Sequence, residues 1–312
     1  RTTLQIQRFI VRDDYVTEIS GGFYGQNRTR WTDWLRTVLG VREDIFYGSD
    51  SSTTGAPDVL GLDVQAVEHA LNSGSTAKGL ASPKAELVFG PWAATEFYLD
   101  AGRGFHSNDV RGALTGLDAY GTALNLIAGD RALAPQSRTP LLTAGTGVEV
   151  GVRSGILPHL QASLALFQLD LDSELVFSGD AGDTSAGRPS RRQGIELSLL
   201  YTPLPWLSLD GDFAFSRARF TDADPGTDDV EPGHPGSYIP EAAKIIASGG
   251  VTVHDLGKWE GALEYRYFGP RPLLEDGSVR SGPTILFNGR IGYKLTDTLT
   301  ADVDVYNIFD SP

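Results

Sequence analysis

The stretch GIELSLLYT, residues 194–202, decides the fold class. Every second residue from Ile195 to Tyr201 is apolar, whereas Glu196 and Ser198 fall between them. Successive side chains of a β-strand point to opposite faces of a sheet. The pattern therefore predicts a strand with one apolar face and one polar face.

The same period of two recurs along most of the chain. Clear alternation covers residues 207–216, 259–267, 284–294 and 299–305. Weaker alternation predicts further strands near residues 1–12, 15–28, 35–47, 84–90, 95–103, 143–153, 160–177 and 246–254. The sequence thus predicts about 13 strands and no convincing helix, and no segment has the ~20 apolar residues of a transmembrane helix.

Strand lengths and connection lengths favour a membrane barrel. Many predicted strands reach ten residues or more, beyond the usual ~5–6 of soluble sheets and close to the ~9–11 of tilted membrane strands. Short turns join residues 32–34, 91–94, 203–205, 255–258 and 296–298, and they alternate with long connections at 48–83, 104–142, 178–193, 220–245 and 269–283. The expected fold is all-β: an antiparallel up-and-down transmembrane barrel with long loops on one rim, apolar side chains outward and charges on a wet lumen.

Five segments resemble TonB-dependent outer-membrane receptors. They are YLDAGRGFHSND at 98–109, FQLDLDSELVF at 167–177, RPSRRQGIE at 188–196, YIPEAAK at 238–244 and VDVYNIFD at 303–310. The resemblance extends from about Tyr15 to Asp310. It implies a barrel of about 22 strands around an N-terminal plug in the outer membrane of a Gram-negative cell. It also implies TonB-energised uptake of a scarce solute such as an iron–siderophore complex.

The chain departs from that family pattern at its ends. No plug, no TonB-contacting segment and no final strand ending in an aromatic residue is visible in the sequence. Residues 1–312 are therefore expected to be the C-terminal portion of such a barrel, with the plug, the early strands and the last strand outside it. The implied partners are outer-membrane lipid and lipopolysaccharide, a small-molecule ligand such as an iron chelate, and the TonB complex through the N-terminal part that this chain lacks.

Charge excludes nucleic acid as a partner. The chain has 26 Lys and Arg against 40 Asp and Glu, a net charge of −14, whereas phosphate binding along a nucleic acid needs a surplus of cations.

Candidate ligand contacts lie in the long loops, because loops held on a rigid scaffold carry recognition. The six candidates are Arg103, His106, Asn108, Asp109, Arg191 and Arg192. The alternative for the first four is a structural loop turn. For Arg191 and Arg192, with Arg188, the alternatives are salt bridges at the loop base or contacts with lipopolysaccharide phosphates.

No enzyme, cofactor or metal site is predicted. The chain has no Cys, no phosphate loop, no Gly-x-Ser-x-Gly and no His-Glu-x-x-His, and the acidic residues between Thr221 and Gly236 fit solvated loop charge better than a Ca²⁺ loop. Two other functions stay open: a passive porin-like or structural barrel, and a soluble β-sandwich or propeller that binds carbohydrate.

Overall fold

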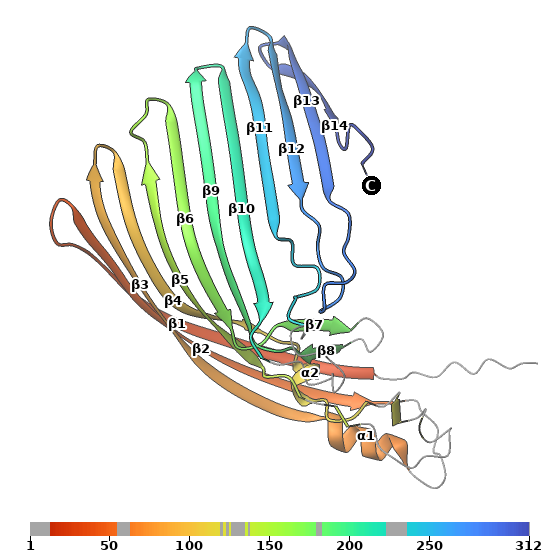
Figure 1. Cartoon of the computed structure of the whole chain (residues 1–312). Coiled ribbons are helices and arrows are strands. Elements are labelled where there is room, and N and C mark those ends of the chain that lie inside the picture. The colour runs from red at the N-terminus through yellow and green to blue at the C-terminus, as the bar shows by residue number, and fades with distance from the viewer. Residues whose placement is uncertain are drawn as a thin grey trace, which may run out of the picture.

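The computed structural model describes residues 13–54, 63–118, 121–122, 125, 135–136, 138–178, 183–222 and 236–311. Within these ranges one antiparallel sheet of 12 strands dominates, and each strand lies beside its neighbour in the chain. Figure 1 shows the sheet as a curved wall, with short turns at one rim and long connections at the other. The sheet is an open arc that has β1 and β14 at its two edges.

The strands are long, as the sequence predicts. In order along the sheet they are β1 (Asp13–Arg30), β2 (Leu35–Thr53), β3 (Gly74–Trp92), β4 (Thr95–Ser107), β5 (Leu142–Ser154), β6 (Leu160–Leu171), β9 (Ser190–Leu204), β10 (Leu207–Phe220), β11 (Ile245–Leu256), β12 (Trp259–Phe268), β13 (Thr284–Thr296) and β14 (Leu299–Val305). The strand predicted near residues 1–12 lies outside the described residues. The alternating strands, the short turns and the up-and-down topology are confirmed.

One predicted strand is wrong in its extent. The pattern at 160–177 reads as a single strand, but β6 ends at Leu171, and β7 (Leu175–Ser178) instead pairs with β8 (Asp183–Ala186) in a separate hairpin. The chain bends at Asp172, directly after β6, and the backbone N–H of Glu174 then bonds the carbonyl of Arg188 at 2.9 Å. A period of two continues through such a bend, so periodicity alone does not reveal it.

The prediction of no helix is also wrong. Helix α1 (Val64–Asn72) and the single turn α2 (Val110–Leu114) lie in long connections at the loop rim (Figure 1). Asp63 caps α1 by accepting a 2.8 Å hydrogen bond from the N–H of Ala66, which satisfies one of the free N–H groups of the first turn. No helix in the described part of the chain is long and apolar enough to cross a membrane.

Strand register separates the two faces of the sheet. Leu166, Ile195 and Phe215 lie side by side on β6, β9 and β10 and form part of an apolar face. The residues beside them, such as Glu196 and Ala214, pair on the opposite face. A cavity on that opposite face draws its lining from β4 through β11. The polar face is therefore the concave one, and the apolar face is convex.

Aromatic side chains gather at the short-turn rim. The rings of Trp34 and Trp92 stack with centroids 6.4 Å apart, and those of Trp259 and Tyr293 lie 4.6 Å apart. Such rings, apolar in body and polar at the indole or phenol edge, suit the level where acyl chains meet head groups. Their position agrees with the interfacial girdle that the sequence predicts.

Candidate functional site

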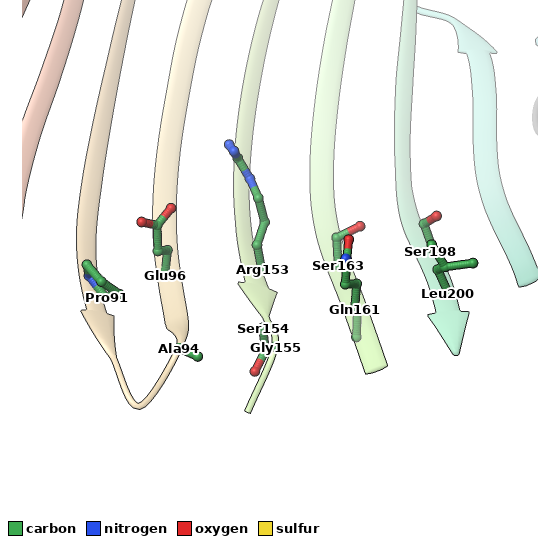
Figure 2. A pocket seen from close by; sticks show the side chains of 11 residues that line it. Pro91, Ala94, Glu96, Arg153, Ser154, Gly155, Gln161, Ser163, Ser198 and Leu200 are labelled. Atoms are coloured by element: carbon green, nitrogen blue, oxygen red, sulfur yellow. The ribbon is translucent and has the colours of Figure 1, made fainter. Parts of the chain in front are cut away.

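The concave wall near the short turns carries an open cavity of about 420 Å³ with a mixed polar and apolar lining. Figure 2 shows its polar lining, which consists of Glu96, Arg153, Gln161, Ser163 and Ser198. These residues stand on β4, β5, β6 and β9, which are adjacent in the sheet. These residue types alternate with apolar ones on each strand, so the pleat brings them to one surface. The cavity therefore offers hydrogen-bond donors and acceptors, with one negatively charged side chain and one positively charged side chain among them.

Ion pairs across strands hold this part of the wall. Arg36 donates to the Glu96 carboxylate at 2.6 Å, and Arg153 lies 3.5 Å from that of Glu86. The Arg153 guanidinium also lies 4.4 Å from the ring centroid of Tyr98. Partly exposed pairs of this kind contribute about 0–1 kcal/mol each, so they order the wall rather than stabilise the fold.

Higher on the concave wall, carboxylates and hydroxyls meet. Ser198 donates to Asp212 at 2.6 Å, and the Tyr98 hydroxyl donates to Glu149 at 2.6 Å. Such groups hold water well, and nothing in their geometry activates a nucleophile. The wall is chemically a wetted surface that a polar solute or a polar protein segment can touch.

At the loop rim, the long connections fold onto the concave side. Val110 and Leu114 of α2 are buried with Leu141 and pack against Phe46 of β2. A Cβ on Gly48 of β2 would lie only 2.6 Å from a Val110 methyl group. Glycine at this position therefore allows α2 to lie directly on the strand. We call this layer, α1 and α2 with residues 108–118 and 138–141, the rim cap.

A buried polar network ties the rim cap together. Asn72 at the end of α1 has no exposed surface. Its side-chain oxygen accepts from the N–H groups of Gly116 at 3.0 Å and Leu117 at 2.9 Å, and its amide donates to the Leu117 carbonyl at 3.0 Å. Glu68, also fully buried, accepts from Ser52 at 2.5 Å and from Asn72 at 3.0 Å. Sequence reasoning misses these residues, because the pattern of a loop segment carries no signal of burial.

Three of the six predicted ligand contacts lie at the rim cap: Asn108 and Asp109 within it and His106 just before it in the chain. All three are buried or held in structural hydrogen bonds. Asp109 caps α2 by accepting from the backbone N–H of Arg111 at 2.8 Å, and the Arg111 side chain donates to it at 3.0 Å. Asn108 is buried and donates to Thr143 at 3.2 Å. The His106 Nε2 and Asn108 Oδ1 atoms are buried and have no hydrogen-bond partner among the described residues.

The other three candidates lie apart from one another. Arg103 is exposed on the strand face that carries Leu99. Arg191 bonds the Asp170 carboxylate at 2.5 Å, and both stand on the convex side by register. Arg192 points to the concave side, where it bonds Glu174 at 2.8 Å. The structure therefore does not bring the six residues into one site, and their contact with a ligand stays a prediction.

In the loop between β12 and β13, the pKa of one carboxylate, Asp276, is changed by hydrogen bonds within its own turn. Asp276 accepts hydrogen bonds from the backbone N–H of Ser278 at 2.9 Å and from its hydroxyl at 2.8 Å. These bonds favour the ionised form and lower the pKa of Asp276 below its ordinary value.

In the described part of the chain, no group of three or more His, Asp or Glu side chains has the arrangement of a metal site.

Comparison with known proteins agrees with this architecture. The chain matches the family model "TonB dependent receptor-like, beta-barrel" over residues 3–308. The catecholate siderophore receptor Fiu of Escherichia coli K12 is 26% identical over 168 residues, which cover 52% of this chain and 21% of that receptor.

Solved structures show the same fold. The ferric-catecholate import receptor Fiu of E. coli K12 in its closed form superposes with a TM-score of 0.67 at 16% identity, over 95% of this chain and 41% of that one. The ferric yersiniabactin uptake receptor FyuA of Yersinia pestis gives a TM-score of 0.70 at 17% identity, over 96% and 42%. The chain thus spans less than half the length of these receptors. It belongs to the TonB-dependent receptor β-barrel family of the Gram-negative outer membrane.

Proposed function

We propose that the full-length protein imports a ferric siderophore across the outer membrane with energy delivered through TonB. The observation that carries this proposal is the family match over residues 3–308, together with likeness to a catecholate siderophore receptor. Catecholate complexes are therefore the first ligand class to test. In this scheme the chain supplies barrel wall and external binding surface, and the segments that contact TonB lie outside it.

The geometry of the wall supports import through a lumen. Cross-strand polar contacts on the concave face, such as Arg36 with Glu96 and Ser198 with Asp212, leave that face wettable. The apolar convex face suits acyl chains. The rim cap folds over the loop end of the concave face, where an incoming solute first meets the protein.

For ligand contact, the proposal favours Arg192 over its neighbour Arg191. Arg192 lies on the concave side near the loop rim, and its bond to Glu174 leaves it partly exposed. Arg191 lies on the opposite side of the same strand. Replacing each with Gln in turn gives a matched pair: Arg192→Gln should weaken binding of the ferric complex, whereas Arg191→Gln should not. Equal binding by the two variants would remove the ligand role of Arg192.

Growth under iron limitation tests the import function. The full-length protein is expressed in a Gram-negative strain that lacks its own siderophore synthesis and receptors, and ferric catecholate, ferric hydroxamate or ferric citrate is the only iron source. We expect growth on the catecholate in cells that have TonB and none in cells that lack it. Growth independent of TonB would instead identify a passive channel, and growth on none of the three would refute siderophore import. Immunoblots of outer-membrane fractions check that the protein is present.

A further inference from the structure

Three of the long connections meet at one largely buried arginine. Arg188 lies in the β6–β9 connection, two residues before β9, and its side chain is only 13% exposed. One guanidinium nitrogen donates to the carbonyl of Asp222 in the β10–β11 connection at 3.2 Å. The other donates to the Gly236 carbonyl in the same connection, and at 2.7 Å to the Glu275 carboxylate in the β12–β13 connection. A single side chain therefore bonds two connections besides its own.

The guanidinium group of Arg188 suits this junction. It presents five N–H donors in fixed directions, so it can reach several acceptors at once. Its central carbon lies 4.1 Å from the ring centroid of Phe220 at the end of β10, and this ring packs in a buried apolar cluster with Ala218 and Ile239. Hydrogen bonds from a charged donor are roughly twice as strong as those between neutral groups, and burial protects this charge from screening by salt.

Backbone hydrogen bonds join the same three connections. The N–H of Thr221 donates to the carbonyl of Pro189 at 2.9 Å, which links the β10–β11 connection to the β6–β9 connection. The N–H of Tyr238 donates to the carbonyl of Glu275 at 2.9 Å, which links the β10–β11 connection to the β12–β13 connection. The side chain of Arg188 therefore lies where these backbone bonds bring the three connections together.

The other two long connections are held by different contacts. The β2–β3 and β4–β5 connections form the rim cap, whose polar centre is the buried Asn72. The hairpin of β7 and β8, which belongs to the β6–β9 connection, contacts α2 of the rim cap (Figure 1). The described part of the loop rim therefore contains two clusters of connections, one centred on Asn72 and one on Arg188, that touch between α2 and β8.

We infer that Arg188 is a positioning residue that joins the β6–β9, β10–β11 and β12–β13 connections into one cooperative unit, which we call the Arg188 unit. A polar group that loses its partner in a largely buried site costs free energy, so release of one connection weakens the hold on the other two. The three connections open together for this reason. An incoming solute then meets them as one surface, a step that rests on the proposed import function, whereas the unit itself does not.

Hydrogen exchange on the full-length protein tests the Arg188 unit without any solute. The protein is held in detergent micelles, and exchange is read by mass spectrometry at several low urea concentrations. One hydrogen-bonded amide reports on each connection: Glu174, Tyr238 and Leu273. We expect the three amides to open with the same free energy and the same dependence on urea, as amides of one cooperative unit do. Three different urea dependences would overturn the inference.

Variants test whether the coupling passes through Arg188. Arg188→Gln should speed exchange about tenfold or more in all three connections. Glu275→Ala alters only the β12–β13 connection, yet it should also speed exchange in the other two, by a smaller factor. Arg191→Gln is the matched control, because Arg191 is paired with Asp170 on the neighbouring strand, and it should change none of the three.

Acceleration confined to the connection that carries the altered residue would refute the coupling, and so would an equal effect of Arg191→Gln. The urea dependence of the unaltered protein stays decisive even if Arg188→Gln fails to fold.

Discussion

A charge placed on each face of one strand provides a sharp test of the membrane assignment. Leu199 and Leu200 are neighbours on β9 with similar exposure, 37% and 40%. Leu199 pairs with Gly211 on the convex face, at the middle of the apolar band, whereas Leu200 pairs with Asp210 on the concave face. The variants Leu199→Arg and Leu200→Arg therefore differ mainly in the medium around the new side chain, which is lipid for the first and the lumen for the second.

The two substitutions should differ in their cost to the free energy of folding by at least about 1 kcal/mol, which is about fivefold in the folding equilibrium. Arginine at the bilayer midplane of a barrel costs about 2–4 kcal/mol, so Leu199→Arg should shift the folding equilibrium about 30-fold to 1,000-fold toward the unfolded state. Leu200→Arg enters a wet lumen opposite a carboxylate, and we expect a change within about 1 kcal/mol.

Reversible unfolding in lipid vesicles measures both values. The full-length protein and the two variants are titrated with guanidinium chloride, and tryptophan fluorescence and the heat-dependent gel mobility of folded barrels report the folded fraction. Equal destabilisation by the two substitutions, or a larger cost at Leu200, would refute the face assignment.

Three further predictions concern the loop rim. Gly48→Val should displace α2, because the added side chain meets Val110, and faster proteolysis within residues 108–118 in folded protein would reveal the displacement. Asn72→Ala leaves the buried N–H of Leu117 and the partly buried N–H of Gly116 without their acceptor, at about 1–3 kcal/mol for the buried group. Hydrogen exchange in the rim cap should therefore accelerate while exchange in the strands stays unchanged. The turn at Asp276 is favoured by ionisation of a carboxyl whose pKa is lowered by bonds from Ser278. Its contribution should therefore be complete above the ordinary Asp pKa and be lost as pH falls through the lowered value, and a carboxyl titration by NMR that shows an ordinary pKa would contradict this.

The sheet was predictable from sequence where one residue in two is clearly apolar. The segment that became β9 shows this alternation from Ile195 to Tyr201, and the structure confirms it. The first half of β3 was missed, because its Gly, Ala, Ser and Thr residues give little contrast between faces. Pro83 adds to the difficulty, since proline is unusual inside a sheet. This first half of β3, residues 74–83, pairs only with β2, and pairing with β4 begins at Lys84.

The rim cap was not predictable for different reasons. Helix α1 has nine residues and α2 has five, which is too short for a helical period to stand out. The burial of Glu68 and Asn72 depends on partners 16 to 45 residues away in the chain. The candidate ligand residues were chosen by their expected loop position, but β9 already begins at Ser190. The pleat of this strand therefore places Arg191 and Arg192 on opposite faces, and the pairing of Arg191 with Asp170 shows which face each one takes.

Chemical labelling of single cysteines along β9 tests the central claim most directly, because the chain has no cysteine of its own. Variants carrying one cysteine at each position from Ile195 to Tyr201 are inserted into lipid vesicles as full-length protein and exposed to a membrane-impermeant, water-soluble maleimide. We expect rapid labelling at 196, 198 and 200 and protection at 195, 197, 199 and 201. The opposite alternation, or equal labelling at all seven positions, would contradict a barrel whose polar face lines the lumen.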